Sequence, residues 1–507
     1  MEGAERDSIL CHCLAANLRA RPDHTALTVS RGEGDEKRWS FGGFFDAATR
    51  LAGGLREQGV ARAERVVLRL EDSSDFALAF FASLAAGLVP VPTSAQLTER
   101  ELRWIVGDAE ARLLITSDAL APEGALPGDV RILASEAFGK LKAYAGAPFL
   151  AETRAEDPAF LIYTSGTTER PKGVLHAQRN AWGRRPMIEG WTGLQAGDVM
   201  LHAGRLNWTY TLGVGLMDPW SVGASAVLYD GPREPALWPA LIEKHRATIF
   251  TAVPTLYRQI LKYCDISRFD LSSLRHGLTA GEPLSPQLLA AWRAATGKEL
   301  YESLGMSEVS TYISSGPSTP IVAGSPGRAQ PGRRVAILPV EGGAHPLPPG
   351  EVGLLAVHRS DPGLMLGYWH RPEEEAACYR GDWFVGGDLA SIDENGYVWF
   401  HGRNDDVMKA LGYRVSPFEV EQVLAEHPGI AEAAVTELEI RPDLSVIAAF
   451  IVPKQAGSIG AEEVLSWCEG RLADYKRPKE IRFLAELPRM ANGKLLRRRL
   501  AAASAGG

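Results

Sequence analysis

The sequence predicts an α/β fold, with a large N-terminal domain built on parallel sheet and a smaller α+β domain at the C-terminus. Helical and strand patterns alternate over residues 38–116, and the same rhythm recurs over 240–250 and 288–301. Strands separated by helices imply parallel sheet, because parallel neighbours need crossover connections. Over residues 320–400, dense Gly and Pro with short apolar runs predict a small antiparallel β unit inside the large domain.

The first alternating region shows how each element is recognised. Apolar side chains recur on one helical face from Phe41 to Gln58, and Arg65 to Leu70 is a short apolar strand. Asp75 is expected to cap the next helix, and the two prolines in residues 89–92 favour an edge strand, since proline cannot donate to a ladder. The expected helices are 41–58, 76–86 and 99–108, and the expected strands are 65–70, 89–92 and 111–116.

A domain boundary is expected just after Arg403. The run Gly402 to Asp406 is rich in residues that suit a turning backbone. We therefore expect a large domain of residues 1–403 and a small domain of residues 404–507. The helices expected in the small domain are 417–426 and 462–472, and the strands are 430–436 and 446–452.

Composition and charge exclude several classes of protein. The 507 residues are 45% hydrophobic and 23% charged, which excludes disorder, collagen and coiled coil for the bulk of the chain. With 54 basic and 62 acidic side chains, for a net charge of -8, the chain is a poor general nucleic-acid binder. The longest apolar run, Phe76 to Val91, contains Ser83 and Gly87 and is too short to span a membrane.

Cysteine usage and the N-terminal residues indicate the compartment. Five scattered cysteines, an odd number, favour reducing surroundings rather than a disulfide framework. The polar start Met1 to Asp7 has none of the features of a signal peptide. We therefore expect a cytoplasmic protein with small-molecule partners, and the oligomeric state is left open, a homodimer included.

The segment from Tyr163 to Gly173 carries the clearest functional signal. It follows an apolar strand pattern and packs hydroxyls, glycines and a lysine together. Glycine lets backbone N–H groups approach an anion, hydroxyls donate, and Lys172 adds a point charge, as a nucleoside triphosphate requires. A Walker A loop is not matched, because Gly follows the lysine where Ser or Thr is needed, and a polar surface turn is the alternative. The candidate phosphate-binding residues are Thr164, Ser165, Gly166, Thr167, Thr168 and Lys172.

This loop resembles the signature of the adenylate-forming, AMP-dependent acyl- and aryl-CoA synthetase superfamily. Further motifs follow in the family's order over nearly the whole chain, although Glu169 stands where the family usually has Gly. Two features look like the benzoate-CoA ligase branch: the aliphatic Leu304, where many members have an aromatic residue, and the run Gly412 to Glu421. The resemblance implies a small mobile C-terminal domain, and ATP, Mg²⁺ and coenzyme A as the cofactor and co-substrates.

The run Tyr301 to Glu308 resembles the family's segment that ends in Gly-x-Thr-Glu. By that resemblance Ser307 contacts the α-phosphate and Glu308 holds Mg²⁺, and a hard cation does prefer carboxylate oxygen. Residues 277–281 also mimic a hydrolase elbow, but the elbow expects Ser and the centre here is Thr, so a wall of the adenine pocket is favoured. The nucleotide-binding residues implied here are Gly281, Glu282, Glu302, Ser303 and Leu304.

The run Gly387 to Arg403 resembles the family's ribose-binding motif. By that resemblance Asp388 accepts from the ribose hydroxyls with Arg403 beside it. Asp405 matches the hinge position, about which the small domain swings.

Two further motifs of the C-terminal domain resemble the family. Gly412 and Tyr413 belong to the loop that closes over the channel for coenzyme A. Leu487 to Arg498 matches the C-terminal lysine motif, in which Lys494 offsets charge on the carboxylate and α-phosphate. Alone, such a lysine would be interpreted as solvated surface.

The acyl pocket of the family begins at Asn207, Trp208 and Tyr210, and the resemblance assigns Gly305 to the same pocket. Two aromatic side chains suit a flat ring, and Asn207 offers a polar contact for a ring substituent. Ordinary core aromatics are the alternative.

The sequence therefore predicts an ATP- and Mg²⁺-dependent carboxylic acid–CoA ligase that activates an aryl or compact cyclic acid as acyl-AMP and then forms the thioester. Three alternatives stay open: an adenylating enzyme that loads a carrier protein in trans, a short- or medium-chain acyl-CoA synthetase, and a nucleotide-binding regulator without turnover. The predicted catalytic residues are Lys172, Ser307, Glu308 and Lys494.

Overall fold

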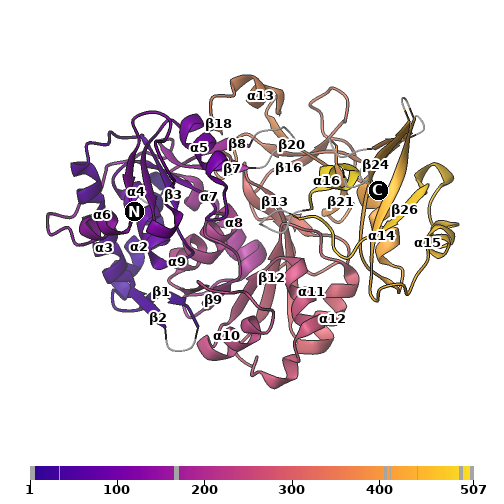
Figure 1. Ribbon diagram of the computed structural model, residues 1–507, viewed down its shortest axis with the longest axis horizontal. Helices are drawn as coiled ribbons and strands as arrows, with labels where there is room; N and C mark the ends of the chain where they lie inside the picture. Colours follow the sequence, from indigo (N-terminus) through magenta and orange to yellow (C-terminus); the bar gives the residue numbers. More distant parts are fainter. Residues whose placement is uncertain are drawn as a thin grey trace. The chain divides into compact units, whose positions relative to one another are not determined.

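Parallel strands joined by helices build most of the chain up to Arg334, as the alternating pattern predicts (Figure 1). By their contacts the residues fall into unit 1, which contains 1–334 and 358–382, and unit 2, which contains 335–357 and 383–507. The expected boundary after Arg403 stays a prediction. The computed structural model describes residues 6–32, 35–164, 171–404, 408–410, 413–441, 444–489 and 495–502.

In unit 1 the large sheet has the strand order β15-β14-β13-β12-β11-β9-β10-β1-β2. Every neighbouring pair from β13 to β1 is parallel, whereas β13–β14, β14–β15 and β1–β2 are antiparallel. The bounds are β1 Thr25–Ser30, β2 Glu36–Ser40, β9 Val199–His202, β10 Ser225–Tyr229, β11 Ile249–Ala252, β12 His276–Ala280, β13 Glu299–Met306, β14 Ser310–Ser314 and β15 Gly327–Ala329.

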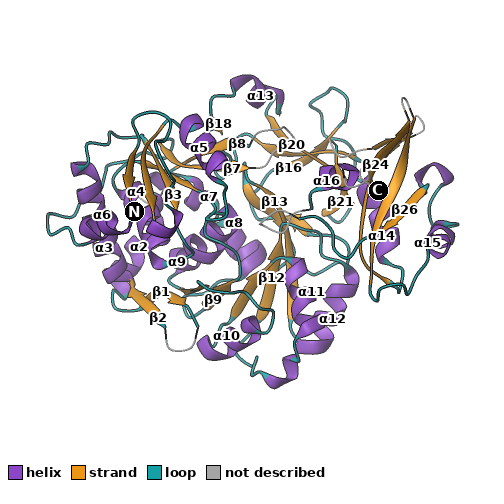
Figure 2. Ribbon diagram, viewed as in Figure 1, coloured by secondary structure: helices purple, strands orange, loops and turns teal. Residues whose placement is uncertain are grey.

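Helices α10, α11 and α12 lie along β9 and β12 (Figures 1 and 2). Their Trp238, Tyr257 and Trp292 are buried in one apolar cluster with Phe250 of β11. Helix α12 starts behind the N-cap Ser285, whose side chain accepts from a backbone N–H, and proline takes its first position. The helix bounds are α10 Leu237–His245, α11 Pro254–Tyr263 and α12 Pro286–Thr296.

A second sheet of unit 1 is parallel throughout and has the order β4-β3-β5-β6. The predicted edge position of β4 is confirmed. Helix α5 matches its predicted bounds, and a capping box between Thr98 and Glu101 fixes its start. The strand bounds are β3 Arg65–Arg69, β4 Val89–Pro92, β5 Ala111–Thr116 and β6 Arg131–Leu133, and the helix bounds are α2 Ile9–Ala20, α3 Phe41–Glu57, α4 Ser74–Ala85, α5 Glu99–Asp108 and α6 Ser135–Lys142.

The predicted cap at Asp75 is wrong. Helix α4 begins at Ser74, and Ser73 occupies the N-cap. Asp75 therefore lies in the first turn, where its carboxylate favours the positive end of the helix dipole and pairs with Lys142.

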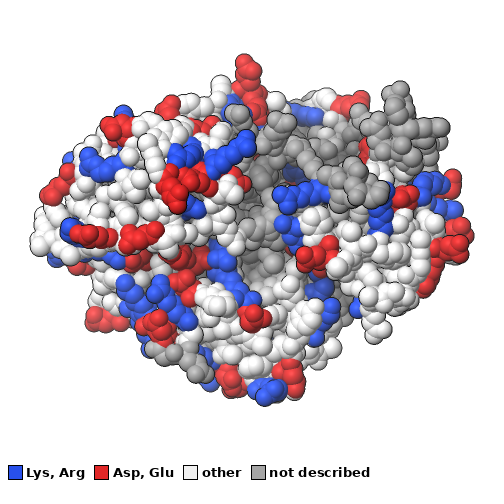
Figure 3. All heavy atoms as spheres, viewed as in Figure 1, with Lys and Arg blue, Asp and Glu red and all other residues white. Residues whose placement is uncertain are grey.

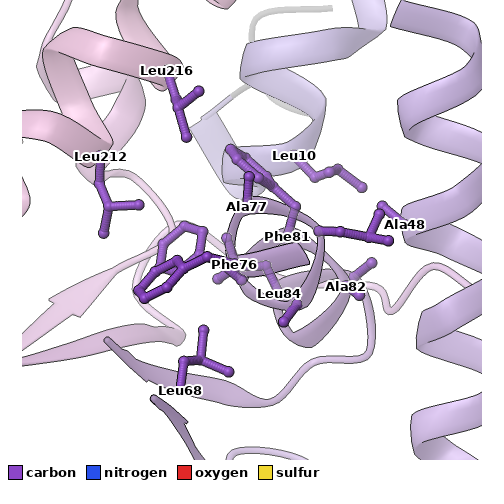
Figure 4. Packing of buried hydrophobic residues seen from close by; sticks show 14 of the residues in the cluster. Leu10, Ala48, Leu68, Phe76, Ala77, Phe81, Ala82, Leu84, Leu212 and Leu216 are labelled. Atoms are coloured by element: carbon purple, nitrogen blue, oxygen red, sulfur yellow. The ribbon is translucent and has the colours of Figure 1, made fainter. Parts of the chain in front are cut away.

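The apolar run that begins at Phe76 is a buried helix leading into β4, as predicted. Phe76 and Phe81 of α4 pack against Leu68 of β3 and Leu212 in one large cluster (Figure 4). The ring of Phe81 also lies 5.0 Å from that of Trp220. Within the described residues, no helix is long and apolar enough to cross a membrane.

Three short helical pieces follow β9 in the chain. They are α8 Thr209–Leu212, the π-helix η3 Gly213–Met217 and α9 Asp218–Val222. The buried guanidinium of Arg184 donates to both carboxylate oxygens of Asp218 at 2.7 Å. A Cβ at Gly213 would lie 2.1 Å from Arg184, so glycine makes room for this ion pair. The pair fixes the π-helix, a geometry that often marks functional sites.

A small sheet of order β18-β8-β7 completes unit 1, in which β7 Pro158–Thr164 and β18 Gly367–Tyr368 are each antiparallel to the central strand β8 Lys172–Ala177. The predicted strand over 159–162 lies within β7. Other short elements are α7 Asn180–Gly183, η2 Ile188–Thr192, α13 Pro372–Ala377, β19 Tyr379–Arg380 and the turns η1 Asp118–Leu120 and η4 Ile266–Arg268.

Unit 2 contains antiparallel hairpins and a three-stranded sheet. The hairpins β16–β17 and β20–β21 confirm the predicted small β unit, and β24, β25 and β26 form the sheet on which α14 and α15 pack. Strands β24 and β25 are longer than predicted, and α15 ends earlier. The bounds are β16 Val335–Leu338, β17 Gly353–His358, β20 Trp383–Ile392, β21 Tyr397–Arg403, β22 Met408–Ala410, β23 Tyr413–Val415, α14 Pro417–Ala425, β24 Ile430–Arg441, β25 Leu444–Pro453, α15 Ala461–Cys468, η5 Asp474–Lys476, β26 Glu480–Phe483 and α16 Arg497–Ala502.

Basic and acidic side chains are interspersed over the face drawn in Figure 3. This mixture agrees with the near balance of 54 basic and 62 acidic residues in the sequence. It gives that face no broad field of one sign, which a general polyanion-binding surface would need.

Candidate nucleotide and acyl site

Several of the predicted site residues of unit 1 follow the carboxyl ends of strands in the parallel part of the large sheet. Strand β9 ends at His202, β12 at Ala280 and β13 at Met306. In parallel sheets these ends meet at one edge, which is where ligands bind. The segments that follow the three strands contain Asn207, Trp208 and Tyr210, then Gly281 and Glu282, then Ser307 and Glu308.

Two of the phosphate-loop candidates, Thr164 and Lys172, lie at the facing ends of β7 and β8. Thr164 closes β7 and pairs in register with Lys172, the first residue of β8. The hairpin therefore presents a threonine and a lysine side by side at the base of the loop. Ser165, Gly166, Thr167 and Thr168 lie outside the described residues.

Lys172 is held by a carboxylate that the sequence did not single out. Its Nζ lies 2.5 Å from Oε2 of Glu374 on helix α13 and 5.3 Å from the ring centroid of Tyr368. The hydrogen bonds from Lys172 and Arg371 lower the pKa of Glu374. A triphosphate that binds Lys172 would therefore compete with this carboxylate for the ammonium group.

Glu308 lies in the turn between β13 and β14 and is held by the same segment. Its Oε1 accepts from the hydroxyl of Tyr368 at 2.7 Å, and its carbonyl accepts from the N–H of Met365 at 2.7 Å. Burial and the Glu308 carboxylate raise the pKa of Tyr368. Lys172 and Glu308 therefore both contact Tyr368. The ammonium of Lys172 lies over its ring, and its hydroxyl donates to the carboxylate of Glu308.

Sequence reasoning missed Tyr368 and Glu374. Glu374 sits within a run of three glutamates, a pattern typical of an ordinary helix start. Tyr368 belongs to a two-residue strand with no periodic pattern. Tyr368 and Glu374 stand out only through their contacts with residues distant in sequence, so no local sequence pattern would have identified them as site residues.

Strand β13 carries the residues predicted to line the adenine. Ser303 is buried and its Oγ donates to the carbonyl of Ile313 on β14 at 2.7 Å, and Leu304 pairs with the same residue in register. A Cβ at Gly305 would lie 2.4 Å from the carbonyl oxygen of Ser310. Glycine is therefore required where β14 approaches, at a register shift of the pair.

Glu302 is half-buried and holds the segment that follows β12. Its Oε1 accepts from the N–H of Leu284 at 2.9 Å. Burial raises the pKa of Glu302 to about 8, against an ordinary 4.5. The neighbouring Glu282 accepts from Thr255 at 2.7 Å, and Gly281 has a φ of +92°. Two carboxyl groups thus fix the predicted wall of the adenine pocket.

The aromatic residues of the predicted acyl pocket lie together. Trp208 and Tyr210 meet edge to face with ring centroids 5.1 Å apart, and Trp191 stacks on Tyr210 at 6.0 Å. A Cβ on Gly281 would lie 3.1 Å from Trp208, so the pocket borders the strand end of β12. Asn207 is half-buried just before this cluster.

In unit 2 the predicted ribose pair lies on one hairpin. Asp388 of β20 and Arg403 of β21 are register partners, with Nη1 and Oδ1 3.1 Å apart. Tyr413 begins β23. Asp405, Gly412 and Lys494 lie outside the described residues.

Two family models match the chain. The model described as AMP-binding enzyme matches residues 14–369, and the model described as AMP-binding enzyme C-terminal domain matches residues 419–494. The mitochondrial acyl-coenzyme A synthetase ACSM5 of Mus musculus is 33% identical over 510 residues, which cover 95% of this chain and 87% of that protein. An uncharacterized acyl–CoA ligase of Bacillus subtilis, YtcI, is 30% identical over 93% of this chain and 92% of its own length.

Solved structures resemble the chain over nearly all of its length. The anthranilate CoA ligase AuaEII in complex with anthranoyl-AMP has a TM-score of 0.89 and 31% identity, covering 98% of this chain and 97% of that one. A benzoate CoA ligase from Burkholderia xenovorans has a TM-score of 0.86 and 31% identity, covering 97% of this chain and 99% of that one.

Replacing Glu302 by Gln should remove a pH dependence of stability. The folded protein keeps the Glu302 proton up to about pH 8, whereas the unfolded chain releases it near 4.5, so wild-type stability falls as pH rises to 8. Buried histidines with a lowered pKa, such as His176, affect the pH dependence of stability only below about 6.5, which is their pKa in the unfolded chain. Between pH 6.5 and 8 the wild type should therefore lose roughly 1–2 kcal/mol more than Glu302→Gln.

Thermal denaturation followed by tryptophan emission measures this difference. A Glu299→Gln variant on the same strand, whose carboxylate pairs with Arg293 at the surface, should follow the wild-type curve. Parallel pH curves for wild type and Glu302→Gln would refute the assignment.

Replacing Glu374 by Gln should strengthen ATP binding, because the nucleotide no longer competes with a carboxylate for Lys172. Since both side chains of this pair are partly exposed, the gain should be modest, about two- to fivefold in Kd. Equilibrium binding of ATP measures it. The exposed neighbour Glu373 provides the control variant, Glu373→Gln, with unchanged affinity. Weaker binding by Glu374→Gln would show that Glu374 instead orients the lysine for the nucleotide.

Proposed function

The chain belongs to the AMP-binding enzyme family and is an ATP-dependent acid–thiol ligase, and we propose that it activates an aryl or compact cyclic carboxylic acid as acyl-AMP before forming the acyl-CoA thioester. Its relatives are named acyl-CoA synthetases, and its structural neighbours include benzoate and anthranilate CoA ligases. The identity of the acid and the role of each residue are the proposal.

One observation carries this proposal: Lys172 and Glu308 converge on Tyr368. A lysine suits the phosphates of ATP, and a carboxylate suits a hard cation that bridges them. Glu308 follows β13 at the edge of the large sheet that the acyl pocket shares, and Lys172 begins β8 of the small sheet. The arrangement can therefore hold a triphosphate with its α-phosphate near an incoming acid.

Glu308 fits a magnesium ion bound mainly through phosphate. Across the described residues, no group of three His, Cys, Asp or Glu side chains gathers as a metal cage. Mg²⁺ is commonly held by one or two carboxylates together with substrate phosphates and water. When bound, the ion neutralises phosphate charge, and Glu308 is the residue that would hold it.

The reaction needs positioning and charge neutralisation more than covalent help from the protein. A carboxylate oxygen of the acid attacks the α-phosphorus, and the bond to the pyrophosphate oxygen breaks. The thiolate of coenzyme A then attacks the acyl carbon, and AMP leaves. Lys172 and Ser307 bind the phosphates, and Lys494 offsets the charge of carboxylate and α-phosphate in the first step.

The nucleoside is assigned to groups already constrained by the fold. We infer that Asp388 accepts from the ribose hydroxyls while Arg403 keeps the carboxylate in place. Gly281 and Glu282 form a wall of the adenine pocket, and Leu304 covers the base. Gly412 and Tyr413 line the path of the coenzyme A thiol.

The aromatic cluster supports an aryl or compact cyclic acid. Trp208 and Tyr210 present flat faces and edges beside Gly281. Gly305 pairs in register with Thr311, and the hydroxyl of Thr311 contacts Met187 of the same apolar cluster.

All five cysteines are free thiols, which suits a reducing compartment, and we place the enzyme in the cytoplasm.

Pyrophosphate release measured with ATP and Mg²⁺ over aryl, alicyclic and short- to medium-chain acids tests the proposal. We expect release with the aryl or alicyclic acids and a higher rate when coenzyme A is present. Release only with aliphatic chains would contradict the acid class. A rate that ignores coenzyme A and rises with a loaded carrier protein would contradict the acceptor.

Replacing Lys494 by Ala should separate the two half-reactions. Loss of the cation should slow adenylation by about two orders of magnitude or more, because the charge that develops between the carboxylate and the α-phosphate then loses its proposed cationic partner. Thioester formation from supplied acyl-adenylate should continue. The exposed Lys262 provides the control, Lys262→Ala, with both rates unchanged. Equal loss of both half-reactions in Lys494→Ala would contradict the role.

A further inference from the structure

Two polar groups in the aromatic cluster of the acyl pocket are buried without a hydrogen-bond partner. Nε2 of His202 and Oη of Tyr210 contact no donor or acceptor among the residues that the structure describes. His202 is 1% exposed and Tyr210 is 7% exposed. Their rings meet edge to face with centroids 4.7 Å apart, so the two side chains pack directly against each other.

The ring of His202 is fixed as a hydrogen-bond donor at Nε2. Its Nδ1 accepts from the backbone N–H of Gly204 at 2.8 Å, which leaves the proton of the neutral ring on Nε2. Burial lowers the pKa of His202 to about 3, so the ring is neutral at physiological pH. Nε2 therefore offers an N–H and cannot accept.

The local backbone is built around this ring. A Cβ at Gly204 would lie 2.8 Å from Cε1 of His202 and 2.2 Å from Oγ1 of Thr211, and a Cβ at Gly215 would lie 3.1 Å from the Cβ of His202. Two glycines thus make room for the histidine between the end of β9 and the π-helix. Buried polar groups are normally paired, and those that are not call for an explanation such as a ligand.

The position of these groups gives the direction of the ligand. Trp208 stands beside Gly281 at the end of β12, Tyr210 packs behind Trp208, and His202 packs behind Tyr210. His202 ends β9, which is separated from β12 by β11, so it is the member of this series farthest from Gly281 along the sheet edge. An acid whose carboxylate faces the nucleotide would bring the opposite side of its ring to His202 and Tyr210.

We propose that His202 and Tyr210 bind an oxygen substituent on the far side of the acid's ring, and that the enzyme's acid is a hydroxy- or alkoxy-substituted aryl carboxylic acid. The proposal rests on the proposed function, since it names the substrate class of the same site. The substituent oxygen accepts from Nε2–H, and Oη of Tyr210 supplies a second hydrogen bond as donor or acceptor.

An amino substituent fits this site less well. An aryl amine presents N–H donors, which would face the N–H of His202 and leave it unpaired. An unsubstituted ring leaves both protein groups unpaired. A site built to bond a substrate hydroxyl discriminates strongly against the analogue that lacks it, because its own polar groups then lose their partners.

The test compares kcat/KM for 4-hydroxybenzoate, benzoate and 4-aminobenzoate, measured by pyrophosphate release with ATP, Mg²⁺ and coenzyme A. Wild type should prefer 4-hydroxybenzoate over each of the other two by about 30-fold or more. The Tyr210→Phe and His202→Phe variants should each reduce this ratio by about tenfold. Tyr257→Phe is the control, since that buried hydroxyl already donates within the fold, and its ratio should match wild type.

The wild-type ratio decides the question even if a variant fails to fold. Equal kcat/KM for 4-hydroxybenzoate and benzoate, or a preference that survives in both folded variants, would overturn the inference and leave the aryl ligase intact. Absence of pyrophosphate release with every aryl and alicyclic acid would overturn the proposed function and the inference together.

Discussion

The site of this enzyme depends on the parallel order of β9, β11, β12 and β13. Because these strands run in the same direction, their carboxyl ends meet at one edge of the sheet. The chain leaves that edge through His202, Ala280 and Met306, and a different part of the proposed site follows each of these residues. The residues proposed for the acyl pocket, the adenine wall and the metal ion therefore lie at one edge of the sheet, although they are far apart in sequence.

The charged side chains Arg184 and Lys172 of unit 1 each form an ion pair within the protein itself. The buried pair Arg184–Asp218 fixes the π-helix, and burying two charges this way requires both partners and good geometry. Lys172, by contrast, is paired with Glu374 on a short helix, where solvent reaches both groups. The first pair is structural and the second is exchangeable. Lys172, which we propose to bind phosphate, is thus paired with a group that an incoming phosphate could replace.

Local sequence signals predicted the fold well, and long-range contacts set the limits of that prediction. Residues 99–108 form the expected helix because a capping box is a purely local feature, whereas Asp75 misled because an acidic residue suits both a cap and a first turn. The aromatic pair Trp208 and Tyr210 was found from its position in a recognisable motif. Tyr368, Glu374 and His202 were not, since each matters through partners that only the folded chain brings near.

The central claim is that the acid attacks the α-phosphorus of ATP and leaves as a thioester through an acyl-adenylate. An accepted acid labelled with ¹⁸O in both carboxylate oxygens tests this directly, with AMP and pyrophosphate analysed by mass spectrometry after turnover. The account predicts one ¹⁸O atom in AMP and none in pyrophosphate, because the bridging oxygen of the anhydride leaves with AMP. Label in pyrophosphate or free phosphate, or unlabelled AMP after complete conversion, would contradict it.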